Sequence, residues 1–356
     1  MFFKQISAKL LCLVISIALT ATFSGIAFAD SARLKIGIIM PLSGEAATFA
    51  APLKQGLELG LKTLPQDLQS QIELKFEDDG LDPKRSISAF NLQANWGAAA
   101  VVNFSSGTAH ALAPLAEKTK IPLIAIASDK NIVKGREFSF IHWVSAAAEG
   151  LVAAEELKKR GHKTLAIIAG EHPGTIAIQE ALADSFGWDG VVLSETFISD
   201  IRDFRGVISK VQRLNPAAVS IILFPGQCAA FAKQLKQSGY KGEISGFEVM
   251  GDPNEVKAAG GALNGIWYVD ASSGTPSFLS AFKKAYGEDA GTYSAANGYD
   301  IIQLLATAWK NGKRTGPEIA DYLATLKDYS GALGTYSATG DHLFTLAAVV
   351  KNTSAR

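Results

Sequence analysis

Hydroxyl groups gather at one point of the chain, where an apolar strand gives way to a helix. Residues 98–102 form a small and apolar run, which is typical of a strand buried on both faces of a parallel sheet. The residues Ser-Ser-Gly-Thr follow at positions 105–108, and a helix is expected over 109–118. The unpaired N–H groups and the partial positive charge at a helix start favour a bound carboxylate or phosphate. The alternative is that these residues only cap the helix.

Two weaker candidates stand at later strand ends. His172 follows an expected strand over 164–169, and Gln227 follows one over 219–224. Ligands of such sheets lie outside the carboxyl ends of the strands. Both side chains are therefore predicted to reach a bound molecule.

Motifs for catalysis or metal binding are missing from the sequence. It has no Gly-x-Ser-x-Gly, no His-Glu-x-x-His and no phosphate loop ending in Gly-Lys-Ser/Thr. The five histidines show no metal-ligand spacing. We therefore expect no enzyme, no metal and no cofactor. The glycosylation sequons at Asn103 and Asn352 are interpreted as chance matches, because Asn103 adjoins the proposed anion site.

Size and charge narrow the class of protein. The 356 residues are 48% hydrophobic and 19% charged, with a formal net charge of zero. This length allows two domains, each with its own core. Neutrality and the lack of a Lys/Arg block argue against nucleic acid as a partner.

The N-terminus has the pattern of an export signal. Lys4 and Lys9 precede an apolar stretch, and Ala27-Phe28-Ala29 has the small-x-small form of a cleavage site. We predict a signal peptide over residues 1–29, cleaved near Ala29, and a mature chain in the periplasm. The alternative is an uncleaved membrane anchor, since residues 10–29 are long enough to span a bilayer. Removal of the signal leaves Cys228 as the only cysteine, so no disulfide is expected within the mature chain.

From Leu34 onward, strand-like and helix-like segments alternate with short breaks. Expected strands also cover 34–40, 72–76, 121–127, 191–197, 243–249 and 266–269, with β-like pieces at 334–337 and 344–351. Helices are expected over 46–64, 147–160, 175–186, 204–214, 229–238, 277–286, 294–311 and 316–327, with a further one capped by Asp82. This rhythm predicts an α/β protein with two doubly wound parallel-sheet lobes and a ligand cleft between them. Candidate crossings between the lobes are 144–149, 270–275 and 329–333.

Several short motifs resemble one known family. They are Pro41-Leu42-Ser43-Gly44, Asp78-Asp79 followed by Asp82-Pro83-Lys84, Phe104-Ser105-Ser106-Gly107-Thr108 and Ile121-Pro122-Leu123-Ile124. Their order is similar to that in periplasmic solute-binding proteins of the leucine/isoleucine/valine type, which serve ABC importers. The resemblance implies the type I periplasmic-binding-protein fold. It assigns residues 30–146 and 274–331 to lobe 1, and residues 147–273 and 332–356 to lobe 2.

The resemblance also implies a binding site. It implies that Ser105, with Ser106 beside it, binds the ligand's α-carboxylate. Groups at Ala127, Ser128 and Asp129 are expected to contribute to this binding. It places the α-ammonium on Glu248 of the second lobe and a packing aromatic ring at Phe49. Alternatives remain: Glu248 as a surface ion pair, Phe49 as a core residue, and Asp129 as a helix cap. Two residues depart from the family pattern, Asp129 where threonine is common and Pro173 where tyrosine is expected.

The expected function is that of a receptor for an amino acid or a similar small zwitterion. Hinge closure would trap the solute, and a membrane permease of an ABC importer would accept it. We expect a monomer that binds no nucleic acid. A periplasmic sensor or activator subunit of the same fold is the alternative, and a secreted hydrolase is a third, for which the sequence lacks a nucleophile–base motif.

Overall fold

The computed structural model describes residues 33–287, 292 and 294–353. The predicted signal peptide lies outside these residues. Within them, no helix combines the length and the apolar character needed to cross a membrane.

The first sheet is parallel and has the strand order β2-β1-β3-β4-β5. Its strands are β1 (Leu34–Met40), β2 (Ile72–Asp78), β3 (Ala100–Phe104), β4 (Leu123–Ile126) and β5 (Ser139–Ile141). The helices that alternate with them are α2 (Glu45–Lys62), α3 (Gln66–Gln69), α4 (Pro83–Trp96) and α5 (Ser106–Thr119). Strand β5 was not among the expected strands, because three residues are too few to show a periodicity.

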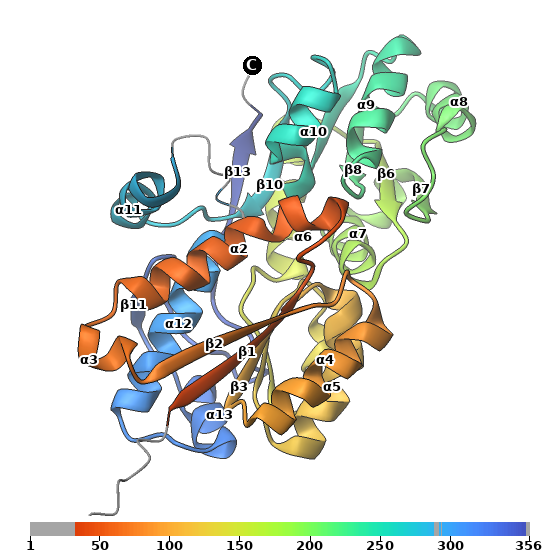
Figure 1. Ribbon diagram of the computed structural model, residues 1–356. Coiled ribbons are helices and arrows are strands. Elements are labelled where there is room, and N and C mark those ends of the chain that lie inside the picture. Colours follow the sequence, from red (N-terminus) through yellow and green to blue (C-terminus); the bar gives the residue numbers. More distant parts are fainter. Residues whose placement is uncertain (1–32, 288–291, 293, 354–356) are drawn as a thin grey trace, which may run out of the picture. The chain divides into compact units, whose positions relative to one another are not determined.

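The second sheet has the order β13-β10-β9-β8-β6-β7 and is parallel except for β13 (Figure 1). Its strands are β6 (Leu165–Gly170), β7 (Val191–Phe197), β8 (Ala218–Ile222), β9 (Glu243–Phe247), β10 (Trp267–Ala271) and β13 (Ala348–Asn352). Its helices are α6 (Ala146–Lys159), α7 (Pro173–Phe186), α8 (Arg205–Leu214), α9 (Gln227–Gln237) and α10 (Pro253–Ala258). Two parallel-sheet lobes with alternating helices confirm the predicted fold class.

Local signals explain where individual elements begin and end. Asp82 caps α4, since its carboxylate accepts a hydrogen bond from the Arg85 amide at 2.8 Å, and Pro83 occupies the first helical position. Gly97, with φ 84°, ends the same helix. Helix α5 begins at Ser106, three residues before the expected start at residue 109. The hydroxyl-rich run therefore forms the first turn of that helix.

The C-terminal part returns to the first lobe before it joins the second sheet. It contains α11 (Pro276–Tyr286), α12 (Ala295–Lys310), α13 (Gly316–Ala324) and the hairpin strands β11 (Tyr329–Gly331) and β12 (Gly334–Tyr336). Helix α12 packs along α2 (Figure 1), and glycine permits the close approach. A Cβ at Gly56 would lie 1.9 Å from the Ala295 carbonyl oxygen.

The residues that follow position 332 bear on where the chain last crosses between the lobes. Residues from 332 onward were assigned to lobe 2. Tyr336 and Phe344 lie in the hydrophobic cluster of the first sheet, whereas β13 pairs with β10 of the second. Their buried rings hold this stretch on the first lobe, so we propose that the chain crosses between residues 344 and 348.

Candidate functional site

The turn between β3 and α5 is held in one conformation by buried polar groups. The Asn103 side-chain amide donates to the Ile39 carbonyl at 3.1 Å, and its oxygen accepts from the Thr108 hydroxyl at 3.1 Å. Between them Ser105 has φ 99°, a value that non-glycine residues adopt at a cost of about 1–3 kcal/mol. Backbone strain of this kind is concentrated at functional sites.

Ser106 joins this turn to the end of β4. Its hydroxyl accepts hydrogen bonds from the amides of Ser128 at 3.1 Å and Asp129 at 3.4 Å. The polar groups predicted from the two strands thus meet at one edge of the first sheet. They are also engaged with one another.

His172, from the second lobe, reaches the start of α5. Its Nε2 atom lies 3.1 Å from the Ser105 hydroxyl and 3.1 Å from the Gly107 amide nitrogen. Its Nδ1 atom lies 3.1 Å from the Gly174 amide nitrogen. Burial, with the nearby His110, lowers the pKa of His172 to about 4, so the ring is neutral at pH 7. A neutral imidazole has one acceptor nitrogen, yet two amides and a hydroxyl converge on it.

An apolar cavity of about 280 Å³ adjoins this point and is lined from both lobes. Aromatic rings dominate its wall: Phe49, Phe104, Trp143 and Phe224. Phe49 and Phe104 meet edge to face, with ring centroids 6.1 Å apart. A largely apolar cavity with a few polar groups is the usual form of a small-molecule site.

Glu248 lies directly after β9, in a short helical turn over Glu248–Gly251, and lines the same cavity. Burial, followed by the charge of Asp270, raises the pKa of Glu248 to about 8. Its Oε2 atom is buried and has no hydrogen-bond partner within the described part of the chain. A buried carboxylate in this state is stabilised by a cation.

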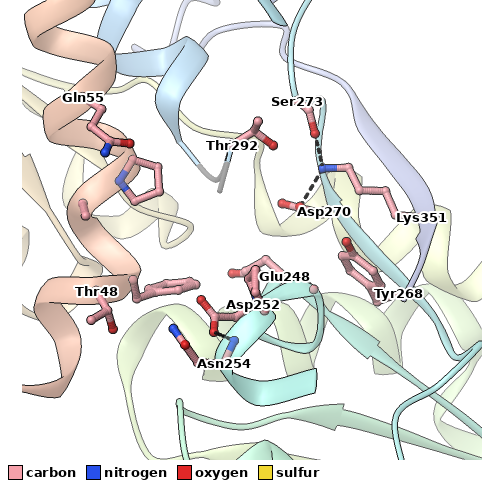
Figure 2. Close-up of a pocket in the computed structure, with 15 residues that line it drawn as sticks. Thr48, Gln55, Glu248, Asp252, Asn254, Tyr268, Asp270, Ser273, Thr292 and Lys351 are labelled. Carbon is pink, nitrogen blue, oxygen red and sulfur yellow. Dashed lines mark hydrogen bonds and ion pairs between the residues drawn. The ribbon is translucent and has the colours of Figure 1, made fainter. Parts of the chain in front are cut away.

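A second cavity of about 330 Å³ shares Phe49 and Glu248 with the first. Figure 2 shows Thr48 and Gln55 of α2 on one side of it, with Asp252, Asp270 and Lys351 on the other. Lys351 Nζ lies 2.7 Å from Asp270 Oδ2 and 2.8 Å from Ser273 Oγ. This cavity is polar and acidic, in contrast to the first.

Seven of the residues predicted for the site line the first cavity. They are Phe49, Ser105, Ser106, Ala127, Ser128, His172 and Glu248. Whether each contacts a solute stays a prediction.

Asp129 and Gln227 line neither cavity. Asp129 Oδ2 lies 2.7 Å from His110 Nε2, and its Oδ1 caps the turn Lys130–Ile132. The Gln227 amide donates to the carbonyl oxygens of Ile198 at 2.8 Å and Ile201 at 3.0 Å. Both side chains are thus engaged in holding loops. Pro173 occupies the first position of α7 and also lies outside both cavities.

Sequence reasoning missed several lining residues. Trp143 follows the short strand β5, which was not predicted, so nothing placed it at a strand end. Asp270 and Lys351 meet only because β13 returns antiparallel to β10. Phe224 ends the strand expected over 219–224, so its position could have identified it as a lining residue. Over the described residues, no group of His, Cys, Asp and Glu side chains is arranged to hold a metal ion.

Comparison with known proteins gives one family and several relatives. The model of a family described as "Periplasmic binding protein" matches residues 33–351. A Leu/Ile/Val-binding protein homolog of Brucella melitensis is 25% identical, over 92% of this chain and 94% of its own length. A leucine-binding protein of Thermotoga maritima superposes with a TM-score of 0.84 at 22% identity, covering 90% of this chain and 95% of its own. A Rhodopseudomonas palustris solute-binding protein, crystallised with 3,4-dihydroxybenzoic acid, superposes with a TM-score of 0.78 at 22% identity, covering 90% and 93%.

Proposed function

We propose a function from one premise: this chain belongs to the periplasmic binding protein family. The chain is a solute receptor without catalytic activity. It holds an amino acid or a similar small zwitterion between its two lobes and delivers it to the membrane permease of an ABC importer. Removal of residues 1–29 releases the monomeric receptor into the periplasm.

The choice of a zwitterion depends on one observation: a group that favours an anion and a group that favours a cation line the same cavity. The first turn of α5, at Ser105 and Gly107, favours an anion. Glu248, from the other sheet, favours a cation. A solute with a carboxylate and an ammonium group satisfies both ends.

The carboxylate must take the place that the His172 ring holds at Gly107. The exchange is favourable because a carboxylate offers several acceptor positions, whereas the neutral ring offers one. Charge-assisted hydrogen bonds are also roughly twice as strong as neutral ones. A solute that replaces this ring and also engages Glu248 stabilises the closed arrangement of the lobes and shifts the population toward it.

The relatives are named for, or crystallised with, two classes of ligand: aliphatic amino acids and aromatic acids. We must choose between these classes. An aromatic acid has no cation for Glu248. Because the pKa of Glu248 is raised to about 8, the group then stays a neutral acid, whereas an ammonium group favours its ionised form and adds a charge-assisted hydrogen bond of about 1.5–3 kcal/mol. We therefore favour the amino acid.

Isothermal titration of the mature chain against leucine, isoleucine, valine and 3,4-dihydroxybenzoate tests the proposal. We expect an amino acid to bind and Glu248→Gln to weaken that binding by at least about tenfold. Glu195→Gln on β7 is the matched control, because Glu195 lines neither cavity. Binding of the aromatic acid alone, or full affinity in Glu248→Gln, overturns the proposal.

Export and delivery are tested separately. N-terminal sequencing of the chain from a periplasmic fraction is expected to begin near Asp30. A membrane-bound chain that retains residues 1–29 contradicts export with cleavage. Uptake of the bound amino acid by proteoliposomes that contain the permease is expected only when the receptor is added.

A further inference from the structure

The second cavity continues the first beyond Glu248. Phe49 and Glu248 line both, so a solute held at Glu248 has room on the far side of that carboxyl group. The first cavity is walled by aromatic rings, whereas the second is lined by Asp252, Asn254, Asp270 and Lys351. Whatever group extends into the second cavity therefore meets polar and charged atoms.

Acidic side chains outnumber basic ones around the second cavity. Glu248, Asp252 and Asp270 line the second cavity, and Lys351 is the one lysine or arginine among its described lining residues. Lys351 is already engaged by Asp270 and Ser273. Lys351 acts on Glu248 only through its charge. Asp252 accepts hydrogen bonds from two backbone amides of α10 but makes no ion pair that the described residues show.

A further buried acid, Glu149, lies near Glu248 and Asp270. Glu149 of α6 has 0% of its surface exposed. Neither of its carboxyl oxygens has a hydrogen-bond partner among the residues that the structure describes. Burial, with the charges of Glu248 and Asp270, raises its pKa well above the usual value. Buried carboxyl groups are ordinarily paired, whereas these acids share one base, Lys351.

Lys351 shows what kind of cation this surface accepts. Its ammonium group is held by a carboxylate and a hydroxyl at 2.7 and 2.8 Å. Across the cavity, Thr48 and Gln55 of α2 add polar atoms and no charge (Figure 2). The described α2 residues that line the cavity thus include no cation that would compete with a ligand.

We propose that the second cavity is a subsite for a second cationic group of the solute. The solute is then an amino acid with a positively charged side chain, or a diamino compound of similar length. Its carboxylate lies at the start of α5, its α-ammonium at Glu248, and its side-chain cation between Asp252 and Asp270. This inference rests on the proposed function and narrows its substrate class.

Matched pairs of amino acids test the charge without changing the length. Norleucine is lysine without the terminal amine, and citrulline is arginine with a neutral end. We expect lysine and arginine to bind at least about tenfold more tightly than their partners, a difference of about 1.4 kcal/mol. Equal or tighter binding of norleucine and citrulline overturns the subsite and leaves the proposed function standing. If no amino acid binds, the proposed function itself fails.

Two variants test whether the acidic residues at the second cavity cause the preference for lysine over norleucine. Asp252→Asn removes one charge and keeps a good cap for α10, because asparagine caps as well as aspartate. Glu149→Gln removes a group that can ionise behind the cavity when a cation binds, and it leaves the cavity wall unaltered. We expect each to reduce the ratio of lysine to norleucine affinity severalfold. Glu155→Gln on the exposed face of α6 is the control. An unaltered ratio in both variants, with thermal unfolding still cooperative, overturns the assignment.

Discussion

The Nε2 atom of His172 lies 3.1 Å from the amide nitrogen of Gly107. An imidazole from one lobe thereby occupies the hydrogen-bonding position at the helix start of the other. Under the proposed function, the neutral ring holds the place that the solute's carboxylate takes. This interpretation replaces the direct solute contact that the sequence predicted for His172, and it leads to the first prediction.

His172→Ala is expected to tighten amino acid binding about fivefold. The solute then no longer displaces a hydrogen-bonded ring, and one such bond is worth about 1 kcal/mol net. Isothermal titration measures the change, with His162→Ala as the control because His162 lines neither cavity. Weaker binding in His172→Ala would restore the direct contact.

The buried acids predict how stability depends on pH. The pKa of Glu248 is raised from 4.5 to about 8 in the folded chain, so the folded state holds more protons than the unfolded state between these values. The free energy of unfolding contributed by this group therefore falls as the pH rises through that window. His172 acts in the opposite sense between pH 4 and 6.5, because its pKa is lowered.

Urea unfolding of wild type, Glu248→Gln and His172→Ala from pH 4 to pH 9 separates the two groups. Glu248→Gln is expected to lose stability less steeply than wild type between pH 6.5 and 8. His172→Ala is expected to differ in slope from wild type only below about pH 6.5. Parallel curves for wild type and Glu248→Gln would mean that this carboxyl group titrates normally in the fold.

Ser105 separates backbone strain from binding. Its φ of 99° suits glycine, so Ser105→Gly is expected to be more stable than Ser105→Ala by about 1 kcal/mol or more. Both lack the hydroxyl, so both are expected to bind the amino acid more weakly, by about fivefold. Chemical denaturation and titration of the two variants side by side measure these effects. Equal stability would show that the turn relaxes without strain.

Gly56 tests the packing of α2 on α12. A Cβ there would lie 1.9 Å from the Ala295 carbonyl oxygen, so Gly56→Ala is expected to lower the free energy of unfolding by about 1–3 kcal/mol. Gly206→Ala in α8 is the control, because nothing lies within 4 Å of its Cβ position. It is expected to be neutral or to stabilise by about 0.5–1 kcal/mol. A mild effect at Gly56 would mean that the two helices can separate slightly.

The regular part of the fold was readable from the sequence. The apolar run ending at Met40 and the cap at Asp82 are local signals, and the elements lie where those signals place them. The short strand β5 and the register of β13 were not readable. The first is too brief for a periodicity, and the second depends on pairing between residues about 80 positions apart.

The candidate site, like the fold, could be predicted only in part from the sequence. Ser105 and Glu248 line one cavity; the sequence singled out Ser105 by its position after a strand, and the family resemblance implied Glu248. The pairing of Asp129 with His110 was not predictable, because it depends on the way a side chain on α5 faces the neighbouring turn. Neither was the approach of Glu149 to Asp270, since a helix and a distant strand must first pack together.

The antiparallel strand β13 carries Lys351, the partner of Asp270, near the end of the chain. A nascent chain that stops short of residue 348 therefore lacks both an edge strand and the base that offsets a buried acid. Under the proposed function, a chain truncated there would lose the lysine beside the second cavity together with the strand that carries it.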